Sequence, residues 1–577
     1  MNHPSQPETG IPSRLRNTST PSTMTPIKKT LGLCLLLALG IDAVHAQSHA
    51  PESGQLLQQV PAPASAPPSN DPGLHVQRAP TGPRADSAPF QVERIEITGA
   101  SLLPTSELHA LVASGEGRQL TLGQLYQLAD RITQAYRAKG YPLASAYVPA
   151  QTLSGGTVRI AVLEARYGTV HLDNRSHTAN RPLDATLAPL AAGAPVAEGP
   201  LDRSLLLLGD IPGVVVNSVL RPGSTPGSSD LYVEASDRPR YTGMLALDDY
   251  GNRYTGRVRA SGSFDVNGLF HQGDLLDASA LSSGPDMKYG RLAYKYLLDG
   301  QGTVLGASAS SLDYRLGGDL RGLHAHGTAR VLGLSLSHPF IRSTRGNLYG
   351  QLEFNRRRLD DDLDLLGTRT RRHTNGWTAT LAGDTRDAHG VTNFNLAGSY
   401  GLLGFDDAFA QYIDALSARS RGHYLKWSVS VSRLQQLSAN NAIYLGFQGQ
   451  WANRNLDTSE QFYLGGANNL RGFDTGVIAG SQGQLLNLEF RHTLAVPLPG
   501  NWMATAFADG GRVTIYKDRF APGANATHMQ DIGLGLRWAG AHQWALSADL
   551  AHPVGARPEM AGPAKSMRAW VQLQKGF

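Results

Sequence analysis

From about residue 239 to the C-terminus, apolar and polar positions alternate with a period of two, which is typical of β-strands. In residues 257–264, Val258, Ala260 and Phe264 share one face, and arginines and serines occupy the other. The same alternation recurs at residues 426–432, 443–451, 486–491 and 532–538. Each predicted strand therefore has an apolar face and a face that carries Lys, Arg, Glu, Gln and Ser.

The charged faces favour a transmembrane barrel over a soluble sandwich. A soluble sandwich buries its apolar faces, whereas a barrel of strands of about ten residues turns them to lipid and lines its lumen with polar groups. These polar faces carry more full charges than a small soluble barrel could enclose. Dividing about 340 residues by about 21 for each strand and its connection predicts about 16 antiparallel strands. We therefore expect an all-β transmembrane barrel over residues 239–577.

Residues 90–238 show a different pattern, in which short strands alternate with segments of helical spacing. The first unit has the order strand, helix, helix, strand, strand, at residues 90–97, 105–112, 122–139, 144–149 and 157–164. The second unit repeats this order at residues 168–174, 184–191, 201–208, 214–221 and 230–234. Two small α+β units in tandem resemble paired POTRA domains, at residues 90–166 and 167–238.

The N-terminus has the pattern of a secretory signal over residues 1–46. An apolar run at residues 31–39 follows a basic pair and precedes Ala46, after which we expect cleavage. Met24 is an alternative start, and the single cysteine, Cys34, lies within the signal. No segment approaches the roughly twenty apolar residues of a spanning helix. An exported chain of this kind is a soluble periplasmic protein or an outer-membrane barrel, and the strand pattern favours the barrel.

Residues 47–89 are rich in Pro, Ala and Ser and are predicted to be a linker, with a candidate short helix at residues 54–60. The charge of the whole chain is nearly balanced, with 52 Lys+Arg against 47 Asp+Glu. This balance does not favour a nucleic-acid partner. A run of charge, Arg356-Arg357-Arg358 followed by Asp360, Asp361, Asp362 and Asp364, is predicted to be a solvated extracellular loop.

A glycine-rich motif supplies the candidate functional residues. Leu470, Arg471, Gly472 and Phe473 follow a Gly-Gly-Ala-Asn-Asn frame, and some thirty residues later come Phe507, Asp509 and Gly511. An arginine in a water-poor lumen requires a carboxylate, and Asp509 is the nearest well-framed one. Alternation places Phe507 and Asp509 on the lumen side of their strand. Taken alone, Arg471 would be interpreted as a hairpin-tip arginine in solvent and Asp509 as a strand-end aspartate.

These motifs, with residues 249–256 and 338–343, resemble the two-partner secretion transporter family, the TpsB outer-membrane proteins. The resemblance implies that an extracellular loop carrying Arg471 enters the lumen and meets Asp509, and that an N-terminal helix plugs the pore. The terminal Phe577 resembles the C-terminal signal that the barrel-assembly machinery reads. Expected partners are one large exoprotein with an N-terminal secretion domain (TpsA-type), outer-membrane lipid, the barrel-assembly machinery and periplasmic chaperones.

The resemblance implies an outer-membrane translocator whose periplasmic POTRA domains bind an unfolded exoprotein, which the barrel exports without ATP. The cargo could be an adhesin, a haemolysin or a contact-dependent toxin. The alternatives are a barrel-assembly insertase of the same superfamily, a passive porin and an outer-membrane hydrolase. We find no Gly-x-Ser-x-Gly elbow, phosphate-binding loop or metal-spaced His/Cys cluster, so we expect no catalytic residue, metal or cofactor, and no enzyme.

Overall fold

The computed structural model describes residues 50–61, 69–77, 87–152, 155–555, 558 and 566–577. The predicted signal sequence lies outside the described residues. None of the helices in these ranges is long and apolar enough to cross a bilayer.

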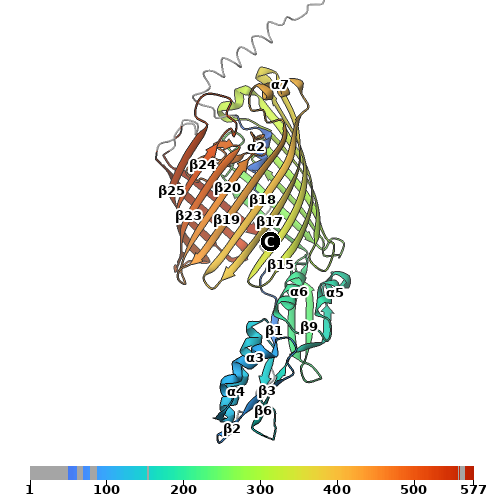
Figure 1. Cartoon of the computed structure of the whole chain (residues 1–577). Coiled ribbons are helices and arrows are strands. Elements are labelled where there is room, and N and C mark those ends of the chain that lie inside the picture. Colours follow the sequence, from blue (N-terminus) through green and yellow to red (C-terminus); the bar gives the residue numbers. More distant parts are fainter. Residues whose placement is uncertain (1–49, 62–68, 78–86, 153–154, 556–557, 559–565) are drawn as a thin grey trace, which may run out of the picture. The chain divides into compact units, whose positions relative to one another are not determined.

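Sixteen antiparallel strands close into a barrel, which confirms the predicted fold class and strand number (Figure 1). Each strand pairs with the next along the chain, except that two short strands interrupt the sequence between the eleventh and twelfth. The barrel strands are β10 (Tyr241–Asp248), β11 (Arg259–Asn267), β12 (Leu275–Ser282), β13 (Met287–Leu297), β14 (Val304–Arg315), β15 (Ala325–Arg342), β16 (Gly346–Leu363), β17 (Thr368–Asp387), β18 (Gly390–Phe405), β19 (Gly422–Gln436), β20 (Asn441–Ala452), β23 (Gln482–Leu494), β24 (Asn501–Thr514), β25 (Ala526–Ala539), β26 (Trp544–Val554) and β27 (Arg568–Gly576).

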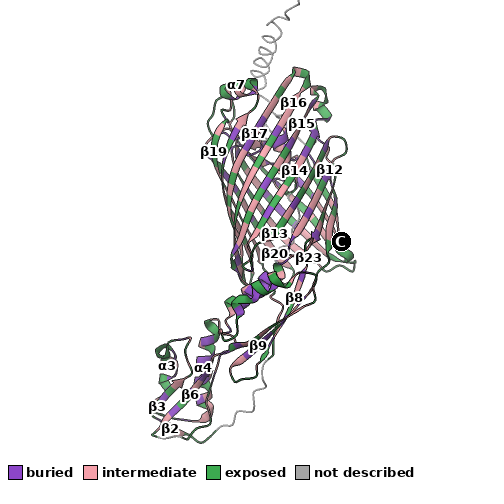
Figure 2. Ribbon diagram, turned by 90° about the vertical axis from the view of Figure 1, so that its right-hand side faces the viewer, coloured by how far each residue is buried: buried purple, intermediate pink, exposed green. Residues whose placement is uncertain are grey.

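The barrel wall has an apolar outside, as the alternation predicts. Leu332, Leu334 and Leu336 of β15 are 60%, 57% and 43% exposed because no described residue covers them on the outer face. Figure 2 shows buried, intermediate and exposed residues interleaved along these strands. Each backbone polar group of the wall can pair with a neighbouring strand, so the barrel has no open edge within the bilayer.

The barrel closes between β10 and β27, the first and last strands. Their register is short and runs from Met244 opposite Gly576 to Asp248 opposite Gln572. Phe577 extends this pairing, since its backbone N–H donates to the carbonyl of Gly243 at 3.0 Å and the reverse bond is also 3.0 Å.

The first α+β unit packs two helices on a small sheet. The sheet has the order β3-β6-β5, and a separate pair joins β2 to β4. Thr121 and Gln124 form a capping box at the start of α4, which fixes where the long helix begins. The predicted strand 90–97 is divided in two at Glu93. The elements are β2 (Phe90–Val92), β3 (Arg94–Thr98), α3 (Thr105–Val112), β4 (Arg118–Leu120), α4 (Leu122–Ala138), β5 (Ser145–Tyr147) and β6 (Thr157–Leu163).

Glu164 ties the end of this first unit to its helices. Its carboxylate accepts hydrogen bonds from the backbone of Ser101 and Leu102 at 2.7 Å and from the Tyr136 hydroxyl at 2.7 Å. Burial raises the pKa of Glu164, but these hydrogen bonds outweigh burial and hold the pKa below its usual value.

The second α+β unit has the sheet order β1-β8-β9-β7. Its outermost strand comes from the predicted linker, since β1 pairs in parallel with β8, Leu74 opposite Ser218. The sequence pattern did not predict this strand. The elements are β1 (Leu74–Val76), β7 (Arg166–Asn174), α5 (Asn180–Leu187), α6 (Glu198–Asp210), β8 (Val214–Pro222) and β9 (Ser228–Asp237).

The prediction of a solvated loop at the charged run was wrong. Residues 356–362 lie in the middle and outer part of β16, and only Asp364 lies beyond it, in a short 3-10 helix. The strand alternates, so Arg357 and Asp361 point into the lumen and meet opposite charges there, Glu460 and Arg372. Charged residues on both faces of a strand resemble a loop in the sequence, because the sequence does not show their partners in the lumen.

Candidate functional site in the barrel lumen

Residues 453–481, which connect β20 to β23, fold into the barrel and form the core of the candidate site. A two-stranded hairpin, β21 (Phe462–Leu464) with β22 (Ile478–Gly480), forms the stem. Leu470 and Phe473 are 0% and 3% exposed. They belong to one apolar cluster with loop residues Leu464 and Ile478 and wall residues Leu485, Val513 and Met529. We call this segment the inward loop.

Two consecutive glycines shape the bend that leads to the motif. Gly465 and Gly466 have φ values of +96° and +124°, a region that L side chains rarely adopt. At Gly465 an added Cβ would also lie 2.2 Å from the carbonyl oxygen of Asp474. The glycine frame in the sequence therefore serves a sharp turn that brings Leu470–Phe473 to the wall.

Arg471 is the principal anchor of the inward loop. Its Nε donates to Asp509 Oδ2 at 2.8 Å and its Nη2 to Asp509 Oδ1 at 2.8 Å, a bidentate pair in which both side chains are almost fully buried. Its third arm, Nη1, donates to Glu489 Oε1 at 2.7 Å. The guanidinium carbon lies 3.5 Å from the centroid of the Phe507 ring. The structure thus brings Arg471, Phe507 and Asp509 together.

The two remaining glycines of the motifs allow close approach. A Cβ on Gly472 would lie 2.6 Å from the Cβ of Asp531, and one on Gly511 would lie 2.8 Å from Leu464 Cδ2. Instead, the backbone N–H of Gly472 donates to Asp531 Oδ2 at 2.8 Å. A larger residue at Gly472 would push the loop away from the wall, whereas at Gly511 it would first displace the terminal methyl groups of Leu464.

The sequence motifs did not include four residues that contact this site: Glu489, Asp531, Trp570 and Asn487. Glu489 accepts from Arg471, and Asp531 accepts from the Gly472 N–H. Trp570 donates from Nε1 to the Arg471 carbonyl at 2.7 Å, and Asn487 bridges the Asn469 carbonyl and Asp509 Oδ1 at 2.9 and 2.8 Å. Asn487, Asp509 and Asp531 are opposite one another on β23, β24 and β25. Strand alternation places all of these side chains inward, so alternation is the signal that could have found them.

Helix α2 (Ser53–Gln58) also lies in the lumen, where the candidate plug was expected. Its Leu56 is fully buried beside inward-facing residues of β14 and β15, among them Leu312 and Ala329. The backbone N–H and hydroxyl of Ser53 donate to Asp361 at 2.8 and 2.9 Å. A Cβ on Gly54 would lie 2.7 Å from the backbone nitrogen of Ser459, so α2 packs directly on the inward loop.

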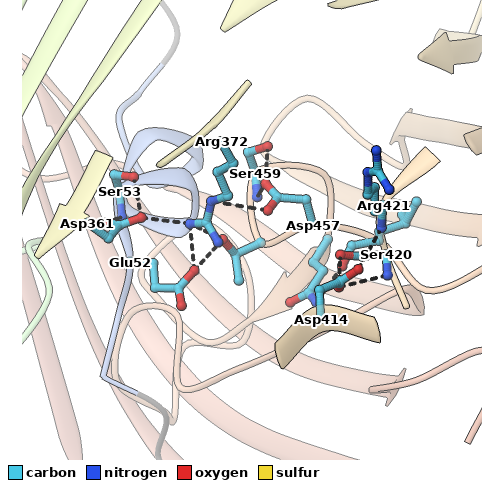
Figure 3. A network of polar contacts seen from close by, with 12 residues as sticks. Glu52, Ser53, Asp361, Arg372, Asp414, Ser420, Arg421, Asp457 and Ser459 are labelled. Carbon is cyan, nitrogen blue, oxygen red and sulfur yellow. Dashed lines mark hydrogen bonds and ion pairs between the residues drawn. The ribbon is translucent and has the colours of Figure 1, made fainter. Parts of the chain in front are cut away.

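Arg372 of β17 is the centre of the contacts around α2 (Figure 3). Its guanidinium pairs with Glu52 at 2.6 Å, with Asp361 at 2.7 Å and with Asp457 at 3.3 Å. Because Glu52 precedes α2, Asp361 belongs to the wall and Asp457 to the inward loop, one arginine connects three separate segments. Gln55 adds a hydrogen bond to the Gly476 carbonyl at 3.0 Å.

The tip of the inward loop also touches the motif at the start of the barrel. The Thr475 hydroxyl donates to the Tyr250 carbonyl at 2.8 Å, and the Tyr250 ring packs edge-on against Trp570 at 5.8 Å. A cavity of about 600 Å³ borders this region, and its lining includes Tyr250, Asn468, Arg537 and Asp549. Phe577, the remaining candidate residue, is 50% exposed at the closure of the barrel and takes no part in the contacts described for this site.

Comparison with known proteins gives the family. The family model described as haemolysin secretion/activation protein ShlB/FhaC/HecB matches residues 227–537, more than half of the chain. The chain belongs to this family. A second model, the ShlB-type POTRA domain, matches residues 90–165.

The curated relatives are named as transporters. The heme/hemopexin transporter protein HuxB of Haemophilus influenzae is 29% identical over 479 residues, which cover 82% of this chain and 84% of HuxB. The outer membrane transporter CdiB of Dickeya dadantii is 25% identical, with 74% of this chain and 77% of CdiB covered. The solved structure of CdiB from Escherichia coli matches with a TM-score of 0.69 at 21% identity, covers 97% of this chain and 100% of that chain, and supports the fold.

Family membership settles the general function and location. The chain is an outer-membrane transporter of the two-partner secretion type, whose family exports exoproteins, and its POTRA domains are periplasmic. The insertase and porin alternatives are not favoured.

Proposed function

We propose that the inward loop, held by Arg471, sets the state of the pore through which one large secreted exoprotein with an N-terminal secretion domain leaves the cell. The observation that carries this proposal is the bidentate Arg471–Asp509 pair, which joins a 29-residue connection, residues 453–481, to the wall inside the lumen. A loop that fills the lumen must yield before a polypeptide passes, and a few charged contacts give it a defined resting position.

The periplasmic domains would capture the exoprotein by strand addition. The edge of β8 carries an added strand, β1, from the chain's own linker, and this pairing supports strand addition to a sheet of this type. In the first unit β5 is an edge strand of its sheet, and its Tyr147 is 48% exposed. We propose β5 as a docking edge for an unfolded segment of the exoprotein.

Export would then run on binding and folding rather than on ATP or catalysis. The sequence has no phosphate-binding loop, and the lumen contacts described above are ion pairs and hydrogen bonds that hold a loop and a helix. A non-enzymatic transporter fits these features. Phe577, which completes the β10–β27 closure, would serve as the signal for the barrel-assembly machinery after periplasmic chaperones deliver the chain.

The relatives suggest the kind of cargo. HuxB is named for heme/hemopexin transport, and we therefore add a heme- or hemopexin-binding exoprotein to the adhesin, haemolysin and contact-dependent toxin classes. Co-expression with a candidate large exoprotein that carries an N-terminal secretion domain tests the proposal. We expect the exoprotein in the medium only when this chain is present, and unchanged levels of other outer-membrane barrels. Loss of those barrels would instead support an insertase.

A further inference from the structure

Three arginines form an exposed basic cluster on the outside of the barrel wall. Arg330 of β15 and Arg358 of β16 are directly opposite each other, and Arg356 lies one outward-facing position along β16. All three are exposed. We call Arg330, Arg356 and Arg358 the outer arginine cluster.

The neighbours of the cluster show which face it occupies. Arg357, between two of its members, points inward and pairs with Glu460. In contrast, Leu332, opposite Arg356, is 60% exposed on the apolar outer wall. Because side chains alternate along a strand, the whole cluster faces away from the lumen.

An aromatic row lies immediately beside the cluster on the same outer face. Phe354, Trp377 and Tyr400 are opposite one another on β16, β17 and β18, and Arg356 follows Phe354 by two residues. Trp377 and Tyr400 are 51% and 53% exposed, and the rings of Phe354 and Trp377 lie 5.0 Å apart. Such aromatic rows mark the boundary between hydrocarbon and headgroups in outer-membrane barrels. The cluster therefore lies at headgroup height.

Chain topology places this boundary at the outer leaflet. The barrel has an even number of strands and follows the periplasmic domains, so its first strand runs outward and its last strand returns to the periplasm. β16 is the seventh strand of the barrel and therefore runs outward. The cluster lies in its outer half, beyond the aromatic row.

No acid among the described residues forms an ion pair with the cluster; Asp360, two residues from Arg358 on the same face, pairs with Arg371. Arg330 and Arg358 are an opposed cross-strand pair of like charges, which is destabilising without an anion. Within the part of the chain that the structure describes, none of the three arginines has an ion pair or side-chain hydrogen bond. The outward-facing arginines of β17 differ, because Arg369 pairs with Asp362 and Arg371 with Asp360 and Asp362.

We propose that the outer arginine cluster binds the phosphate groups of a phosphorylated glycolipid in the outer leaflet. Guanidinium groups bind phosphate through paired, charge-assisted hydrogen bonds, and a phosphate between Arg330 and Arg358 would remove their repulsion. The aromatic row beside the cluster would contact the sugar and upper acyl region of the same lipid. The cluster thus fixes the height of this side of the barrel in the membrane.

Lipid binding to the purified full-length protein tests this proposal. Diphosphoryl lipid A is titrated into detergent-solubilised protein, and bound lipid is counted by native mass spectrometry. The variant Arg356→Gln/Arg358→Gln is expected to bind about tenfold more weakly than the unaltered protein. The matched control Arg369→Gln/Arg371→Gln removes the same charge from the same outer face and should bind as the unaltered protein does. The single change Arg330→Gln should weaken binding by a smaller factor.

Heat modifiability on a gel verifies that each variant is a folded barrel, and two further titrations separate the possible ligands. Lipid A without phosphates should bind the unaltered protein weakly. Its affinity should match that of diphosphoryl lipid A for the Arg356→Gln/Arg358→Gln variant. Equal loss in both double variants, or no loss in either, would overturn the proposal. Complete displacement of the lipid by millimolar inorganic phosphate would identify a free-phosphate site and would also overturn it. Secretion is not measured, so these outcomes are independent of the proposed function.

Discussion

Two buried arginines connect lumen segments to the barrel wall, and they differ in which side of the contact supplies the positive charge. Arg471 belongs to the inward loop and reaches acids that the wall supplies, Asp509 and Glu489. Arg372 belongs to the wall and pairs with Glu52, an acid that directly precedes helix α2. The first arrangement holds the loop through its own cation, whereas the second holds the helix through a carboxylate that is still 41% exposed.

This difference predicts unequal strength. Removing Arg471 would leave Asp509 and the nearby Asp531 as buried carboxylates without a cation, whereas Glu489 would keep its ion pair with Arg491 at 2.7 Å. Breaking a buried pair in this way costs about 3–5 kcal/mol. Removing Arg372 would also leave Asp361 and Asp457 buried without this cation, although Asp361 keeps the hydrogen bond from Tyr314 and Asp457 the one from Ser459. Glu52, the acid that precedes α2, is 41% exposed and can be hydrated. Helix α2 has only six residues and therefore adds little stability of its own. We therefore regard the inward loop as the stable latch and α2 as the element that is released more easily.

The largest expected effect comes from Arg471→Ala. Secretion of the exoprotein should fall by about tenfold or more, because the loop loses its bidentate anchor and the wall keeps unpaired acids. The variant should still be a heat-modifiable barrel in the outer membrane, since the strand pairing does not depend on this contact. Exoprotein in the medium is quantified by immunoblot against the cell-associated fraction, and unchanged secretion would remove the latch from the account.

Arg372→Ala should change the permeability of the pore more than it changes secretion. We expect secretion within about twofold of the unaltered protein, because the main anchor of the inward loop remains. Conductance in planar bilayers and sensitivity of cells to large antibiotics should rise as α2 leaves the lumen. A secretion defect as severe as that of Arg471→Ala would show that the two arginines act as one unit and would erase the distinction.

The smallest effect is expected from Glu489→Gln. The amide oxygen can still accept from Arg471 Nη1, and Asp509 keeps both of its bonds to the guanidinium, so secretion should fall by about twofold at most. Asp509→Asn is the matched change at the bidentate position and should cost more. If the two amide variants secrete equally, the ranking of the two acids is wrong.

Much of this arrangement could be predicted from sequence because alternation is a local signal. The period of two gave the barrel, the repeated α+β order gave the periplasmic units, and alternation put Asp509 on the same side as Phe507. If the residue pairing between neighbouring strands is also known, alternation places Asn487 of β23 opposite Asp509 of β24, and Asp531 of β25 opposite Asp509 on its other side.

Contacts between distant segments could not be predicted in the same way. Glu52 and Arg372 are separated in sequence by both α+β units and the first seven barrel strands, and no local pattern relates them. Likewise, Trp570 donates a hydrogen bond to the Arg471 carbonyl from β27, and β27 takes its position only when it pairs with β10 to close the barrel. The charged run at residues 356–364 was misassigned because its lumen partners lie on other segments, Glu460 for Arg357 and Arg372 for Asp361.

The most direct test of the latch is the charge exchange between its two residues. The single variants Arg471→Asp and Asp509→Arg, and the double variant that combines them, are compared for exoprotein secreted per barrel in the membrane. If the two charges pair as described, the double variant should secrete several-fold more than either single variant, a coupling of about 1 kcal/mol or more. Equal loss in all three variants would contradict the pairing as the basis of function.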